Sequence, residues 1–123
     1  MLYLIIMTVI DGAYIKIGMT NNSMRSRLSS YRTHIPFAQV VAIANTIGDN
    51  ACYAESEFHK AMDNHGKMEQ VYMGSEWFKV TDKNIIQQIT EKGFRYFNEK
   101  LWYYQLTDII KIDKPIYEAY KVL

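Results

Sequence analysis

The start of the chain contains the pattern that most constrains its fold. Residues 2–9 form a short, continuous apolar run, which is typical of a buried strand rather than of a helix. Asp11-Gly12 follows at once, and this dipeptide favours a tight hairpin turn. Residues 13–18 then alternate between the two faces of a second strand. The chain is therefore expected to begin with a β-hairpin.

One face of the second strand carries reactive side chains. Tyr14, Lys16 and Gly18 share this face, and Ile15 and Ile17 share the other. A lysine between two isoleucines is either an edge residue whose ammonium reaches solvent or a charged group at a functional site. We favour the functional interpretation.

The next helix brings an arginine to the edge of the core. A run of N-cap residues ending at Ser23, together with Pro36, predicts a helix over residues 23–33. Its apolar stripe consists of Met24, Leu28 and Tyr31. At ~100° per residue, Arg27 lies about 60° from that stripe. This position favours a functional arginine over an ordinary surface ion pair.

A second helix carries a glutamate and a histidine on one flank. The helix is expected over about residues 50–62, capped by Asp49 or Asn50. Glu55 falls about 70° from the centre of its apolar face, and His59 lies one turn further on the same flank. The two side chains are thus expected to lie close together.

The remaining elements are a strand over residues 37–44, an extended segment over 76–80, and a helix capped by Asp82 and ended by Gly93. A last strand is expected over residues 109–112.

Composition limits the class of protein. The chain has 123 residues, 49% of them hydrophobic, which suits one domain with one core. Its net charge of +1 is low for a protein that grips a long duplex, so contact with nucleic acid should be local. Cys52 is the one cysteine and excludes an intrachain disulfide. The apolar opening has no basic region before it and is too short to span a bilayer, so we expect a cytoplasmic protein.

Four of these features occur in a familiar order: Tyr3, the Tyr14-Ile15-Lys16-Ile17-Gly18 strand, Arg27 and Glu55. This order resembles the GIY-YIG nuclease superfamily, above all its small branch with a K-I-G core followed by E-x-x-x-H and E-W-F. The resemblance covers roughly residues 1–90. Two positions depart from the superfamily pattern, because Met1-Leu2-Tyr3 keeps only the tyrosine of the first motif and Lys16 replaces the second tyrosine.

The resemblance implies a metal-dependent phosphodiesterase with four catalytic residues. Tyr3 would activate water, its phenol pKa lowered by the ammonium of Lys16. Arg27 would pair with the scissile phosphate, and Glu55 would hold Mg²⁺ or Mn²⁺. For each residue an ordinary alternative stays open, namely a hydrogen-bonded core tyrosine, an edge lysine, a surface ion pair and an exposed helix carboxylate.

Four more residues are expected to support the site: Tyr14, Gly18, His59 and Glu76. The resemblance implies that Gly18 lets the backbone turn closely at the cleft. His59 would orient Glu55 or form an i,i+4 pair with it. Glu76 would brace the cleft, while the Trp77 and Phe78 that follow it close the core.

The C-terminal third has no counterpart in the resemblance. We therefore divide the chain into a GIY-YIG-like domain over residues 1–93 and an extension over 94–123, packed on that domain or at an interface. Its aromatic residues, Tyr96, Trp102, Tyr103, Tyr104, Tyr117 and Tyr120, are interleaved with Arg95, Lys100 and Lys111. They could stack on bases, but core or dimer contacts are favoured, and a homodimer is the default arrangement.

We thus expect an α/β domain of the α+β kind, with a small, mostly antiparallel sheet flanked by helices. The expected function is cleavage of nucleic acid, DNA rather than RNA, by a phage- or mobile-element-encoded endonuclease that does not enter membranes. The alternative is a catalytically silent protein of this fold that binds a partner protein or a nucleotide and counteracts a host defence.

Overall fold

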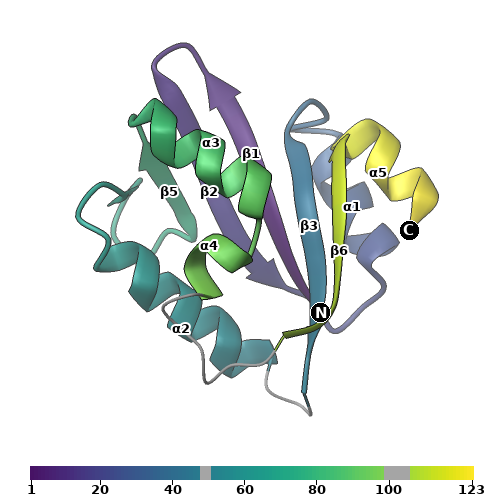
Figure 1. Ribbon diagram of the computed structural model, residues 1–123. Helices are drawn as coiled ribbons and strands as arrows, with labels where there is room; N and C mark the ends of the chain where they lie inside the picture. Colours follow the sequence, from purple (N-terminus) through teal and green to yellow (C-terminus); the bar gives the residue numbers. More distant parts are fainter. Residues whose placement is uncertain (48–50, 99–105) are drawn as a thin grey trace.

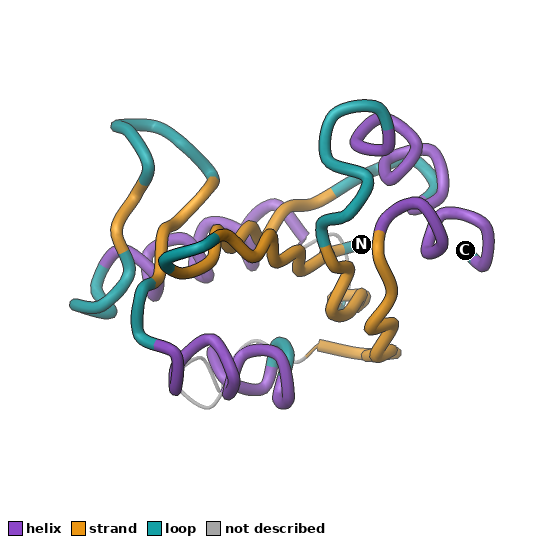
Figure 2. The backbone as a smooth tube through the Cα atoms, turned by 90° about the horizontal axis from the view of Figure 1, so that it is seen from above, coloured by secondary structure: helices purple, strands orange, loops and turns teal. Residues whose placement is uncertain are grey.

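A six-stranded antiparallel sheet, with strand order β4-β5-β2-β1-β3-β6, forms the centre of the molecule (Figure 1). This computed structural model describes residues 1–47, 51–98 and 106–123. Helices lie on both sides of the strands when the sheet is seen from above (Figure 2). The predicted α+β class and the antiparallel sheet are confirmed.

The predicted hairpin consists of β1 (Leu2–Val9) and β2 (Gly12–Met19). Val9 pairs with Gly12, so the turn residues are Ile10 and Asp11, one position earlier than predicted. A Cβ at Gly12 would lie 2.3 Å from the carbonyl oxygen of Val80. A side chain at position 12 would therefore clash with strand β5 (Trp77–Val80) where it approaches the hairpin.

Helix α1 (Met24–Arg32) and strand β3 (Gln39–Thr46) follow. The Ser23 side chain accepts the backbone N–H of Ser26, so the predicted N-cap is confirmed. Strand β3 begins two residues later than predicted, and Phe37 lies exposed before it.

Helices α2 (Ala51–Asp63), α3 (Lys83–Lys92) and α4 (Arg95–Asn98) contribute to the core on one face of the sheet. The predicted boundaries of α3 are confirmed, with Asp82 as N-cap and Gly93 as C-cap. The expected α2 caps, Asp49 and Asn50, lie outside the described residues.

Two short strands, β4 (Glu69–Gln70) and β5 (Trp77–Val80), complete the sheet beside β2. The sequence predicted β5 but not β4, which is only two residues long.

The C-terminal segment joins the same sheet. Strand β6 (Leu106–Pro115) pairs with β3 and is longer than the predicted residues 109–112. Helix α5 (Ile116–Val122), which the sequence analysis did not predict, packs beside α1 (Figure 1).

The aromatic residues of this segment have ordinary structural contacts where they are described. Tyr96 packs against Phe97, Tyr117 packs edge-on against Phe37, and the guanidinium of Arg32 lies over the ring of Tyr120. Lys100, Trp102, Tyr103 and Tyr104 lie outside the described residues.

Alternation along β1 and β2 divides the core into two clusters. Leu2, Leu4, Ile15 and Ile17 belong to the cluster that α2, α3 and α4 complete. Tyr3 and Ile5 belong to the cluster that α1 and α5 complete. This alternation therefore points Tyr3, Lys16 and Gly18 toward α1. Among the described residues, no helix is long and apolar enough to cross a membrane.

Ile116→Ala tests whether α5 belongs to the cooperative core. Ile116 is 0% exposed, so its truncation should lower the free energy of unfolding by about 2–5 kcal/mol. Val122, on the same helix, is 62% exposed, and Val122→Ala should change it by less than about 0.5 kcal/mol. Urea denaturation measures both values. Equal effects of the two variants would show that α5 unfolds separately from the sheet.

Candidate functional site

A polar pocket of about 280 Å³ lies where β2 ends and the chain turns into α1. We call it the Lys16 pocket. It is lined by Tyr3, Lys16, Met19, Thr20, Asn21, Arg27, Glu55 and Glu76. The structure thus brings together all four residues expected to be catalytic, together with Glu76 from the supporting group.

The ring of Tyr3 occupies space that only a glycine leaves open. Tyr3 pairs across the hairpin with Gly18 and is 2% exposed. A Cβ at Gly18 would lie 2.3 Å from the Tyr3 hydroxyl oxygen and 2.4 Å from the adjacent ring carbon. Gly18 is therefore not a turning point of the backbone, as the resemblance implied, but the second-last residue of β2, where it makes room for Tyr3.

The pKa of Tyr3 is shifted in the direction opposite to the expected one. Burial raises the pKa of Tyr3 well above its ordinary value, and the hydrogen bond with Tyr31 raises it further. The two hydroxyl oxygens are 2.9 Å apart. The Lys16 ammonium does not offset these effects, because it lies beside Tyr31 instead. This direction favours the protonated phenol, which can donate its O–H.

Lys16 is a buried cation held by several partners. It is 9% exposed, and its Nζ lies 3.0 Å from a carboxylate oxygen of Glu76. The same Nζ lies 5.1 Å from the ring centre of Tyr31 and 5.7 Å from that of Trp77. Burial alone would lower the pKa of Lys16, but hydrogen bonds to Tyr31 and Glu76 outweigh it, so the pKa is raised. The lysine thus keeps its charge inside the protein.

Arg27 is the second cation of the Lys16 pocket. It is half-buried, as its place beside the apolar stripe predicted, whereas Arg25 and Arg32 on the same helix are exposed. Within residues 1–47, 51–98 and 106–123, no salt bridge involves its guanidinium. A guanidinium that lines a pocket without a carboxylate partner can pair with an anionic ligand.

Glu55 reaches the Lys16 pocket from α2, which lies beyond the end of β2 in Figure 1. Burial and the negative charge of Glu76 raise the pKa of Glu55. His59, the backbone N–H of Met19 and the charge of Lys16 act in the opposite direction without cancelling this effect. A cation bound beside the two carboxylates would relieve their repulsion.

The donor set fits Mg²⁺ or Mn²⁺ better than a metal that needs a full protein cage. Among the described residues, no group of three or more His, Cys, Asp or Glu side chains could hold a metal ion. Zinc sites usually take three or four protein ligands. Mg²⁺ is commonly held by one or two carboxylates, with water and substrate phosphate as the other ligands. Glu55, with Glu76 beside it, meets that smaller requirement.

Two supporting residues lie beside the Lys16 pocket rather than in it. Nε2 of His59 lies 2.7 Å from the carbonyl oxygen of Ile17 and donates to it, which ties α2 to β2 one turn from Glu55. Tyr14 lies two residues from Lys16 on the same face, and the ammonium of Lys79 sits 4.9 Å from its ring centre. His59 is thus placed to fix the helix that carries Glu55.

Sequence reasoning missed Tyr31 as a site residue. Its spacing from Leu28 indicated a core position, and it does pack against the Tyr3 cluster. Its hydroxyl nevertheless contacts Tyr3, and its ring contacts Lys16. No local pattern distinguishes a core tyrosine from one whose hydroxyl reaches a site, so only the fold reveals this role.

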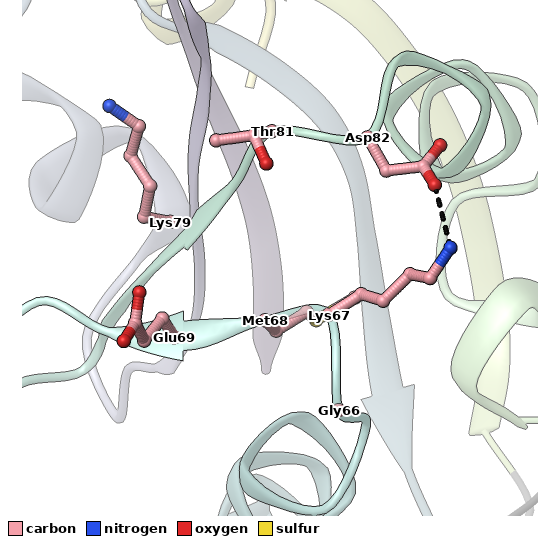
Figure 3. Close-up of a pocket in the computed structure, with 7 residues that line it drawn as sticks. All are labelled: Gly66, Lys67, Met68, Glu69, Lys79, Thr81 and Asp82. Atoms are coloured by element: carbon pink, nitrogen blue, oxygen red, sulfur yellow. Dashed lines mark hydrogen bonds and ion pairs between the residues drawn. The ribbon is translucent and has the colours of Figure 1, made fainter.

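A larger hollow, of about 610 Å³, lies near β4 and the start of α3. Figure 3 shows Lys67 reaching across it to Asp82, with 3.0 Å between Nζ and the carboxylate. The other oxygen of Asp82 accepts the N–H groups that begin α3. This carboxylate therefore stabilises the start of α3. Glu69 is the other acid that lines the hollow, and both of its lysines are already paired, Lys67 with Asp82 and Lys79 with Asp11.

Gly18→Ala tests the close approach of Tyr3. The added methyl should force the Tyr3 ring to move and lower the free energy of unfolding by about 1–3 kcal/mol. In a Tyr3→Ala background the same change should cost much less, because the clashing ring is gone. Chemical denaturation of the four proteins measures the coupling. Additive effects would contradict the packing described for this pair.

Glu55→Gln should stabilise the protein at neutral pH. The pKa of the Glu55 carboxyl is raised above its ordinary value of 4.5 in the folded state. Its contribution to folding stability is therefore fully present below pH 4.5 and is lost as the pH rises through the raised pKa. The uncharged variant should therefore melt at a higher temperature than the unmodified protein at pH 7.5, and at an equal temperature below about pH 4. Thermal melts at both pH values measure this. A variant that melts at a lower temperature at pH 7.5 would contradict the assigned repulsion.

Comparison with known protein families gives a match over the part of the chain that forms the Lys16 pocket. The T5orf172 domain matches residues 1–92, about three quarters of the chain. This domain occurs in phage-associated, endonuclease-like proteins and is related to the GIY-YIG nucleases. Neither the curated proteins nor the solved structures gave a significant match. The Lys16 pocket is built entirely from residues within the matched region. The chain belongs to the T5orf172 domain family.

Proposed function

We propose that the protein is a metal-dependent nuclease that hydrolyses phosphodiester bonds, with DNA as the preferred substrate. The observation that carries this proposal is the Lys16 pocket, in which two cations and two carboxylates meet from separate elements of the fold. Membership of the T5orf172 family, which suggests a nuclease-like or DNA-binding protein, supports the same conclusion.

The cations would bind the scissile phosphate. Arg27, which lacks a salt bridge within the described residues, would pair with two phosphate oxygens. Lys16, fixed by Glu76, would add a second positive charge without first having to be ordered. Tyr3 would donate its O–H toward the phosphate or the attacking water, because its raised pKa keeps it protonated.

The carboxylates would supply the metal ligand and the remaining Brønsted base. Glu55 would hold Mg²⁺ or Mn²⁺, with Glu76 beside it. A bound divalent cation would stabilise the negative charge that develops on the phosphate oxygens. The water oxygen would bond to phosphorus as the bond to the sugar oxygen breaks. One of the two carboxylates would take the water proton, because the raised pKa of Tyr3 favours its protonated form.

A catalytically silent binding protein is the second candidate. The raised pKa of Tyr3 favours it, because a protonated phenol is a poorer general base than the one expected at this site. Such a protein would hold a nucleotide or a partner protein at the same pocket and could counteract a host defence. The expected homodimer and cytoplasmic location stay predictions under either function.

Glu55→Gln distinguishes the two candidates. Plasmid DNA and RNA should be cleaved by the unmodified protein with Mg²⁺ or Mn²⁺ and not with EDTA. The variant should lose cleavage by about 100-fold or more, because an amide is a poor Mg²⁺ ligand. Mg²⁺ should also raise the melting temperature of the unmodified protein but not that of the variant.

Glu57→Gln is the matched control. Glu57 lies two residues further along α2, where it pairs with Lys60, and its replacement should leave cleavage nearly unchanged. Absence of cleavage with every metal and substrate would favour the silent binding protein. An active Glu55→Gln variant would assign the metal to another acid.

A further inference from the structure

A second hollow adjoins the Lys16 pocket and differs from it in chemistry. It has a volume of about 450 Å³ and an almost entirely apolar lining. We call it the aromatic hollow. Its walls include Tyr14, Tyr31, Tyr72 and Trp77, with Met7 and Ile35. No acidic residue lines it. A volume in this range and a wall of rings suit a flat, uncharged ligand group.

Tyr31, Trp77 and Lys16 connect the two cavities. Both rings line the aromatic hollow, and Lys16 lines the other pocket. The ammonium lies 5.1 Å and 5.7 Å from the two ring centres. An anionic group held by Lys16 would therefore lie next to the mouth of an apolar, ring-lined space.

This juxtaposition matches the two halves of a nucleotide. Bases stack on Tyr and Trp rings, while lysine and arginine contact the backbone phosphates. Lys79, whose ammonium lies 4.9 Å from the ring centre of Tyr14, already pairs with Asp11 at 3.0 Å. Arg27 lines the adjoining pocket and has no salt bridge within the described residues, so it favours an occupant that carries a phosphate over a partner protein or a second copy of the chain.

We propose that the aromatic hollow receives an unpaired nucleobase next to the phosphate held at the Lys16 pocket. This inference rests on the proposed function and deepens it, since it specifies the substrate as single-stranded or locally unpaired nucleic acid. A base inside a duplex would first have to leave its stack, which costs a few kcal/mol. Tyr72, at the rim and 69% exposed, covers the bound base.

Base-dependent binding tests the proposal without requiring cleavage. Fluorescence anisotropy in EDTA would compare a labelled ten-residue oligothymidine with the same strand made abasic at its internal positions. The unmodified protein should bind the thymidine strand about tenfold more tightly, the typical value of one or two stacked bases.

Tyr72→Ala should remove most of that preference while leaving binding of the abasic strand unchanged. Tyr72 is exposed and does not line the Lys16 pocket, so the variant should fold normally. Tyr117→Ala is the matched control, because Tyr117 is also an exposed tyrosine but lies on α5, and it should keep the full preference.

Several results would overturn the proposal. These are equal affinity for the two strands, no binding of either, or a preference that survives Tyr72→Ala. A dimer in light scattering that Tyr72→Ala converts to a monomer would also overturn it, because a second copy would then cover the hollow. A protein that cleaves DNA without base preference would keep the proposed function and lose this inference. A protein that prefers the thymidine strand but never cleaves would keep this inference and lose the proposed nuclease function.

Discussion

The charge of Lys16 is the constraint on which the site depends. An ammonium on a central strand loses most of its hydration, and an unpaired buried charge would cost several kcal/mol. The structure offsets this cost with the Glu76 carboxylate at 3.0 Å and with the rings of Tyr31 and Trp77. These partners come from α1 and from the start of β5. Keeping one lysine charged therefore fixes how two distant segments meet the hairpin.

The same arrangement places two carboxylates, Glu55 and Glu76, in one pocket. Glu76 is needed for Lys16, but its charge also acts on Glu55 and raises the pKa of that group. Core packing alone would not place two acids in one pocket. Like charges that lie close together lower the stability of the folded protein, and they are common at functional sites, where a bound ligand relieves the repulsion. A bound divalent cation would relieve the repulsion between Glu55 and Glu76.

Local sequence patterns were sufficient to predict the strands, the helix caps and the side of a helix on which a residue lies. The hairpin strands, the Ser23 and Asp82 caps and the half-buried position of Arg27 follow from periodicity and capping. The turn was misplaced by one residue, and the close contact between Gly12 and Val80 of β5 was not foreseen because it is non-local. The pKa direction of Tyr3 was wrong for a similar reason. The prediction considered Lys16 on the neighbouring strand, but not Tyr31 on a helix that folds over both. The site residues were identified through a family resemblance, and their roles could not be read from spacing alone.

The modest net charge becomes understandable once the two cavities are considered together. A net charge of +1 is low for a protein that holds nucleic acid through a long series of phosphate contacts. Arg27 and Lys16 supply two cations at one point, which suits one or two phosphates. Further affinity would then have to come from contacts that do not involve charge. Stacking of bases on aromatic rings is such a contact. For the nuclease proposed above, the apolar, ring-lined hollow beside the Lys16 pocket would therefore add contact with a base to a small number of phosphate contacts.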